Sequence, residues 1–205
     1  MRLSAATLLL VSGLPIFSQQ VPQSTQQQTP QSVEAQQQAP LPPPPGQTLS
    51  NDQLNDLVAP VALYPDPLLS QILVASTYPL ELVQLQQWLD RNPGITGTAL
   101  IQAVEQQNWD PSIQAMAVFP DLVKRLNQDI TWTTNLGNTF LIQQADVMDA
   151  VQRMRAQAQQ GGKLSSSAEQ TVTNTTDNGQ PIIQIQPANP QVVYVPYYDP
   201  YSIWG

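Results

Sequence analysis

Apolar residues recur at helical spacing between Leu49 and Gly162, where prolines and glycines divide the chain into short pieces. The apolar positions in each piece lie three or four residues apart, which is typical of a helix that buries one face. Two of these stripes are Leu68, Leu69, Ile72 and Leu73, and Leu82, Val83, Leu85 and Leu89. The pattern predicts short helices near 50–59, 67–76, 79–90, 97–107, 111–118, 120–129 and 131–160, with a break in the last.

Several helix ends are marked by residues that suit a cap. Asp66-Pro67 and Asp110-Pro111 each place a carboxylate at the N-cap and a proline at the first helical position. Gly161-Gly162 follows the last apolar stripe, as expected for a C-cap. We therefore predict a helical domain over residues 49–162.

Beyond Gly162 the sequence favours strands. Residues 171–175, 182–185 and 191–195 are rich in Val, Ile, Thr and Tyr, and Asp177-Asn178-Gly179 is a turn signal between the first two. A meander of this size is not stable alone, so we expect it to pack on the helices or on a partner. The predicted fold class is mainly α: a compact multi-helix domain of short helices, with a small C-terminal β-meander (within residues 163–205) packed on it.

The N-terminal part has two patterns of its own. Residues 1–18 have a positive start at Arg2 and a short apolar stretch, which predicts a secretory signal peptide, with an uncleaved membrane anchor as the alternative. Residues 19–48 form a Gln/Pro-rich linker with too few apolar positions to bury a core, so we expect it to be disordered. No later stretch is long and apolar enough to span a membrane, so together with the signal peptide the sequence predicts export to the periplasm or outer envelope.

Composition excludes several kinds of chemistry. The 205 residues include no cysteine and no histidine, which removes thiol nucleophiles, thiolate metal sites and imidazole catalysts. The net charge of −8 argues against nucleic acid, because phosphate binding needs a basic patch. No catalytic or cofactor motif is present, so we expect no enzyme activity, cofactor or bound metal.

Carboxylates are the plentiful ionisable groups, and two of them facing each other in a cleft are what a glycosidase requires. A carboxylate-dependent hydrolase acting on envelope glycan is therefore the alternative function. Capping, helix-dipole or solvated roles are the favoured interpretation for each candidate carboxylate. The candidates are Asp66, Glu81, Asp90, Glu105, Asp110 and Asp121.

Aromatic residues gather near the C-terminus, where the core-forming pattern is poor. Flat rings with polar atoms suit protein interfaces and sugar stacking, so this cluster is the candidate partner-binding site. The alternative is that the rings simply cover the helical domain. The five residues are Tyr194, Tyr197, Tyr198, Tyr201 and Trp204.

Long motifs carry a family resemblance. They are LVAPVALYPDPLLSQILVASTYPLELVQLQQWLDRNP (57–93), AVEQQNWDPSIQA (103–115), QQADVMDAVQRMRAQAQ (143–159) and IQPANPQVVYVPYYDP (185–200). They resemble the bacterial exported-protein family catalogued as domain of unknown function 3300. The resemblance implies an envelope protein of Gram-negative-type bacteria without an assigned activity. Together with the aromatic cluster it predicts a non-catalytic scaffold or binding module that contacts an envelope protein or cell-wall polymer.

Overall fold

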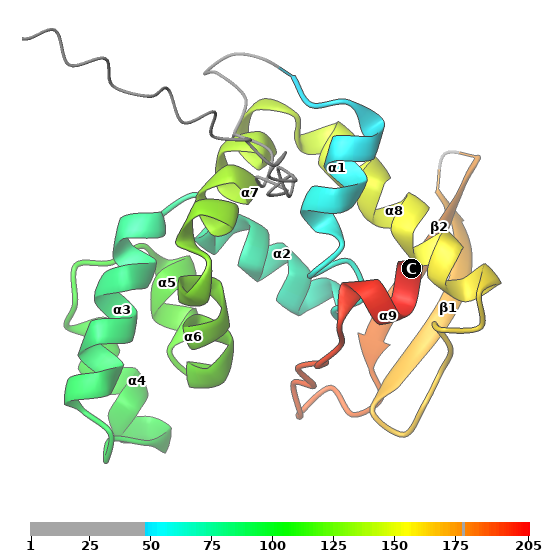
Figure 1. The fold of residues 1–205 in the computed structure, drawn as a ribbon. Coiled ribbons are helices and arrows are strands. Elements are labelled where there is room, and N and C mark those ends of the chain that lie inside the picture. Colours follow the sequence, from blue (N-terminus) through cyan, green and yellow to red (C-terminus); the bar gives the residue numbers. More distant parts are fainter. Residues whose placement is uncertain (1–47, 178) are drawn as a thin grey trace, which may run out of the picture. The chain divides into compact units, whose positions relative to one another are not determined.

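Eight helices follow one another from Asn51 to Gln160 in the computed structural model, which describes residues 48–177 and 179–205 (Figure 1). They are α1 (Asn51–Val58), α2 (Asp66–Ala75), α3 (Pro79–Arg91), α4 (Gly97–Glu105), α5 (Pro111–Met116), α6 (Pro120–Gln128), α7 (Ile130–Ile142) and α8 (Gln144–Gln160). The seven predicted helical segments are confirmed, and the expected break in the last falls at Gln143. The predicted signal peptide 1–18 and the linker up to residue 47 lie outside the described residues.

Local capping explains many of these boundaries. Ser50 and Gln53 form a reciprocal capping box at the start of α1, and the predicted Asp110 cap accepts a hydrogen bond from the Ser112 N–H. Asp129 caps α7 in the same way, through the Trp132 N–H. The predicted N-cap at Asp66 is wrong: Pro65 precedes the helix, and Asp66 is its first residue, with its carboxylate turned to another partner.

The helices enclose one hydrophobic core with contributions from α1 to α8. The backbones of α7 and the end of α2 come close at Gly137, where a Cβ atom would lie 2.0 Å from the carbonyl oxygen of Ser76. Only glycine allows α7 to approach the end of α2 so closely. The largest fully buried apolar side chains include Tyr64, Leu54, Leu68, Leu69, Ile72, Leu73, Leu82, Leu85, Ile113, Met116 and Leu122.

A two-stranded antiparallel hairpin follows α8. Strands β1 (Gln170–Asp177) and β2 (Gln180–Pro187) pair with Val172 opposite Ile185 and Asn174 opposite Ile183. Strand β2 packs on α2 and α8, and its buried Ile183 and Ile185 join a small second cluster there. The mainly helical class with a small β unit packed on it is therefore confirmed.

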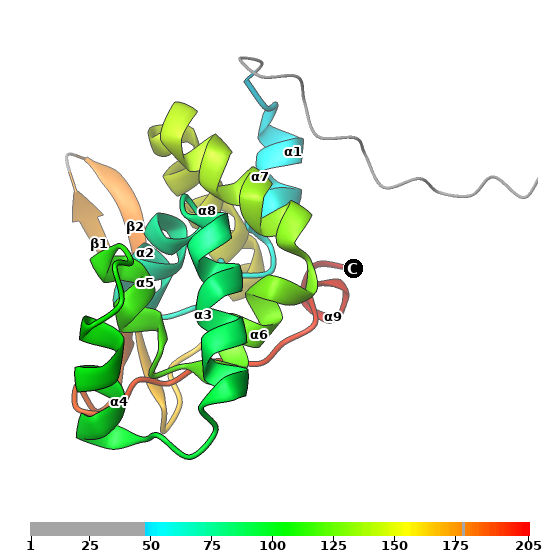
Figure 2. The ribbon, with the colours of Figure 1, turned by 90° about the vertical axis from the view of Figure 1, so that its left-hand side faces the viewer.

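The third predicted strand, 191–195, is wrong. These residues form no strand, because Pro190 and Pro196 at their ends lack N–H donors and no described strand pairs with the segment between them. The chain instead crosses back over the helices and ends in a short helix, α9 (Pro200–Trp204), which is capped by Asp199 and packs on α8. Figure 1 and Figure 2 show this segment following β2 and ending in α9.

Within the described residues no single helix is long and apolar enough to span a membrane, and only α2 and α3, which meet at 105°, reach that length as a pair.

Candidate functional site

Residues 188–205, here called the C-terminal strap, are fastened to the helical domain by two aromatic side chains. The Tyr198 hydroxyl donates to the Ala59 carbonyl at 2.8 Å and accepts from the Leu63 N–H at 3.2 Å. The Trp204 indole N–H donates to the Met154 carbonyl at 3.1 Å. The Tyr198 ring stands edge-on to Trp204 at 5.8 Å and to Tyr64 at 6.0 Å. These contacts hold the strap in one place on the domain.

Two other strap tyrosines point the opposite way. Tyr197 is 86% exposed and Tyr201 is 85% exposed, and Val192 and Val193 are also exposed. Tyr194 is half-buried. The predicted cluster of five aromatics therefore divides: Tyr198 and Trp204 cover the helical domain, whereas Tyr197 and Tyr201 face solvent.

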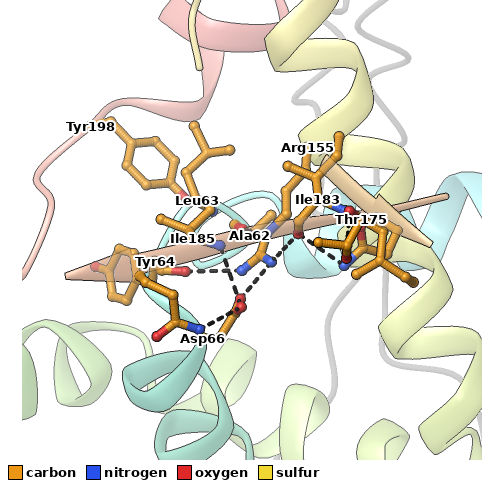
Figure 3. Close-up of polar contacts among 12 residues, drawn as sticks. Ala62, Leu63, Tyr64, Asp66, Arg155, Thr175, Ile183, Ile185 and Tyr198 are labelled. Atoms are coloured by element: carbon orange, nitrogen blue, oxygen red, sulfur yellow. Dashed lines mark hydrogen bonds and ion pairs between the residues drawn. The ribbon is translucent and has the colours of Figure 1, made fainter. Parts of the chain in front are cut away.

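Arg155 organises the loop on which the strap sits. This side chain of α8 is almost fully buried, and its guanidinium donates to the Ala62 carbonyl at 2.8 Å, the Tyr64 carbonyl at 3.0 Å and the Ile183 carbonyl at 2.8 Å (Figure 3). It also forms an ion pair with Asp66. The backbone of the loop 59–65 therefore accepts hydrogen bonds from both the buried Arg155 of α8 and Tyr198 of the strap.

The Asp66 carboxylate extends this network into the hairpin. Its second oxygen accepts from the Ile185 N–H and from the Gln186 amide, both at 3.3 Å. Desolvation by burial lowers the pKa of Arg155, and the neighbouring Asp66 opposes that effect. The guanidinium remains charged at every physiological pH.

Sequence reasoning did not single out Arg155, although a signal was present. Val147, Val151 and Arg155 are spaced four residues apart, so the arginine continues an apolar stripe of α8. A charge on a buried stripe requires partners of opposite polarity, which the loop carbonyls and Asp66 supply here.

A second arginine connects the strap to a cavity. Arg125 of α6 donates to the Tyr64 hydroxyl and to the Pro196 carbonyl, and its guanidinium carbon lies 4.7 Å from the centre of the Tyr197 ring. Burial raises the pKa of Tyr64, and the Arg125 charge partly offsets this. The exposed Tyr197 is thereby tied to the helical domain through a cation–π contact.

The cavity beside Arg125 has a volume of about 280 Å³. It lies between the loop 59–65, α6 and the start of α7, and most of its lining is apolar. A space of this size fits one large side chain or one sugar ring. The lining residues are Pro60, Val61, Tyr64, Leu122, Arg125, Leu126, Gln128, Asp129 and Trp132.

The candidate carboxylates have structural partners. Asp66 pairs with Arg155, and Asp90 accepts from Gln86. Glu81 accepts the Asp110 N–H at 2.7 Å, while hydrogen bonds from Ser112 lower the pKa of Asp110. In the described parts of the chain, no three acidic side chains come together in a way that would hold a metal ion.

Glu105 and Asp121 remain at the surface. Both are exposed, and Asp121 lies in the first turn of α6, where the helix dipole favours a negative charge.

Sequence comparisons agree with the family resemblance of these motifs. The family described as Protein of unknown function (DUF3300) matches residues 50–205. The chain belongs to this family. A relative from Escherichia coli (strain K12), named "Uncharacterized protein YacH", is 39% identical over 236 aligned residues, which cover 98% of this chain. The chain spans 38% of that relative's length. No solved structure matches the family member described here.

Proposed function

We propose that this family member is a non-catalytic binding module of the bacterial cell envelope, and that it contacts its partner through the C-terminal strap. The observation that supports this most strongly is the opposite placement of neighbouring tyrosines. Tyr198 is half-buried and its hydroxyl is hydrogen-bonded to the helical domain, whereas Tyr197 next to it is 86% exposed. An exposed ring on a firmly docked segment loses little conformational entropy when a partner binds.

The surroundings of Tyr197 supply the rest of a contact surface. Arg125 stacks on the ring and also lines the apolar cavity of about 280 Å³. Tyrosine and arginine are the residue types that dominate binding energy at protein interfaces, and an aromatic face also stacks on sugar rings. Either an envelope protein or the cell-wall polymer is therefore a suitable partner.

The envelope location rests on the sequence of the N-terminal region. An apolar stretch after Arg2 within residues 1–18 is typical of a secretory signal, and the Gln/Pro-rich residues 19–48 would separate the domain from it. We propose export on that basis. The alternative, a glycan hydrolase, gains no support from the carboxylates, because Asp66, Glu81 and Asp110 each take part in structural hydrogen bonds.

The experiment is co-sedimentation of the purified full chain with washed bacterial cell-wall sacculi. We expect the wild-type chain to pellet and the double variant Tyr197→Ala/Tyr201→Ala to stay in the supernatant. The matched control replaces two exposed apolar side chains on other elements, Leu80→Ala/Leu141→Ala, and should pellet like the wild type.

Three results are informative. Loss of binding in the tyrosine variant alone supports the strap as a wall-binding surface. Equal pelleting of both variants contradicts the proposal. If the wild-type chain does not pellet, the wall polymer is excluded as the partner, and a protein partner is then tested by crosslinking in the intact envelope.

A further inference from the structure

The hairpin has one covered edge and one edge that is partly open. On the covered side, the Ile183 N–H donates to Gln152 of α8 at 2.8 Å and the Ile185 N–H donates to Asp66 of α2. The Ile183 carbonyl accepts from Arg155. Helix side chains therefore cover the outer edge of β2 at Ile183 and Ile185.

Strand β1 forms the other edge of the hairpin. The alternating hydrogen-bond pattern of an antiparallel pair determines which backbone N–H and C=O groups of β1 face outward. In an antiparallel pair, residues opposite each other either exchange both hydrogen bonds or point both pairs of groups away. The backbone N–H and C=O groups of Ile183 and Ile185 point away from β1. The backbone groups of their partners, Asn174 and Val172, therefore point away from β2. By the same alternation, Thr176 also directs its N–H and C=O to the outer edge.

Only the first part of this outer edge is covered. The Ser166 hydroxyl accepts from the Val172 N–H at 2.9 Å and donates to the Val172 carbonyl at 3.3 Å. Among the described residues, no polar atom pairs with the outward backbone groups of Asn174 or Thr176. The Asn174 side chain itself faces α8, where it accepts from Gln159. Asn174 and Thr176 therefore present four free backbone groups at this edge, two N–H donors and two C=O acceptors.

The sequence of this edge does not protect it. Proteins usually guard an open edge with lysine, proline or a bulge, because unpaired N–H and C=O groups are a template for another strand. Strand β1 reads QTVTNTTD, which has no lysine and no proline, and its single charge is Asp177 at the end. Both faces of its last five residues are exposed.

We propose that two copies of this chain pair through β1, antiparallel, about a two-fold axis that passes through Thr175. In this register Asn174 of each copy faces Thr176 of the other, so that four hydrogen bonds form and all the free groups are used. A register centred on Asn174 would set Val172 against Thr176, but the Val172 groups are already occupied by Ser166.

Charge and side-chain pairing favour a second copy as the occupant. About the Thr175 axis, Asp177 faces Thr173 of the other copy, so the two carboxylates are not opposed. Thr175 faces Thr175, and threonine pairs across strands are favourable. The product is a four-stranded sheet, in which β1 of each copy becomes a central strand while β2 remains covered by its own helices.

The absence of cysteine makes the register directly testable in the full chain. Thr175→Cys places two thiols opposite each other in a non-hydrogen-bonded pair, at a Cα separation of about 4.5 Å, which is compatible with a disulfide. Thr173→Cys is the matched control: it lies on the same face, yet the two copies of residue 173 are about 13 Å apart in this register.

We expect mild oxidation to crosslink Thr175→Cys at least about tenfold faster than Thr173→Cys, because pairing holds its thiols at high effective concentration. Equal crosslinking rates for the two variants would overturn the proposed register.

A second variant removes the pairing without removing the hairpin. Asn174→Pro deletes an N–H that points away from β2, so the β1–β2 ladder keeps its hydrogen bonds. Sedimentation velocity should show a concentration-dependent dimer for the wild type and a monomer for Asn174→Pro, with unchanged circular dichroism. Asn174→Thr, which keeps the N–H, should dimerise. A wild-type chain that stays monomeric at every concentration contradicts pairing with a second copy.

Discussion

Arg155 of α8 and Asp66 at the start of α2 form an ion pair, with 2.6 Å between Nη1 and Oδ1, although 89 positions separate them in the sequence. The same guanidinium binds three carbonyl groups in the loop 59–65 and in β2. One side chain thus joins helix, loop and hairpin at the place where the C-terminal strap docks.

Loss of Arg155 should therefore destabilise the whole domain. Arg155→Met removes the charge partner of Asp66 and the guanidinium donor to three carbonyls, and removing one member of a buried pair typically costs about 3–5 kcal/mol. Because Asp66 is 30% exposed, we expect a loss at the lower end of this range. The free energy of unfolding in urea should fall by about 3 kcal/mol. The exposed Arg91→Met is the control and should change stability by less than about 0.5 kcal/mol. A loss for Arg155→Met as small as that of the control would contradict the proposed role.

The Tyr198 hydroxyl should contribute separately from its ring. Tyr198→Phe keeps the ring contacts with Tyr64 and Trp204 but leaves the Ala59 carbonyl and the Leu63 N–H unpaired. An unsatisfied buried group costs about 1–3 kcal/mol, so we expect a loss of about 2 kcal/mol in urea unfolding. Tyr197→Phe, at the exposed neighbour, should leave stability unchanged; equal effects at both positions would contradict the assigned orientation.

Alkaline pH should unfold the protein through its buried phenols. Desolvation by burial raises the pKa of both Tyr198 and Tyr64 above the ordinary value of 10.0. Above that value the unfolded chain loses protons that the folded chain keeps, so the stabilisation present below about pH 10 declines as pH rises, by about 1.4 kcal/mol per pH unit for each phenol. Urea midpoints from about pH 9 upward measure this decline. The decline of stability with pH should be shallower in Tyr198→Phe than in the wild type. An identical decline in that variant would contradict the prediction.

The approach of α7 to α2 should not tolerate a methyl group. A Cβ at Gly137 would meet the Ser76 carbonyl carbon at 2.3 Å and the Thr77 nitrogen at 2.7 Å, both of them backbone atoms that cannot rotate away. We expect Gly137→Ala to lose about 3 kcal/mol or more, with a lower thermal midpoint. Gly94→Ala is the matched control, because nothing lies within 4 Å of its Cβ position and its backbone suits alanine. A Gly137→Ala variant as stable as the Gly94→Ala control would contradict the packing.

Short-range chemistry explains why the helices could be predicted and the strap could not. Apolar spacing and the Asp110 cap depend on residues within one or two turns, and the helices follow them closely. The role of Asp66 depends on Arg155, far away in sequence, so the same Asp-Pro motif gives a cap in one place and an ion pair in the other.

Tyr197 and Tyr198 make the same point at the candidate site. The two residues are identical and adjacent, and no local pattern distinguishes them. Their different exposure is decided by the loop 59–65, which offers a carbonyl and an N–H to Tyr198 only. Residues 191–195 have strand-like composition, yet the available edge of β2 is already occupied by helix side chains.

The most direct test of the strap as a contact surface is site-specific photocrosslinking in intact bacterial envelopes. A photoreactive phenylalanine analogue replaces Tyr197, and in parallel it replaces the exposed Leu141 of α7 as the control position. The proposal predicts a discrete adduct, to an envelope protein or to wall polymer, from position 197 and none from position 141. An adduct from position 141 alone, or none from position 197, would contradict it.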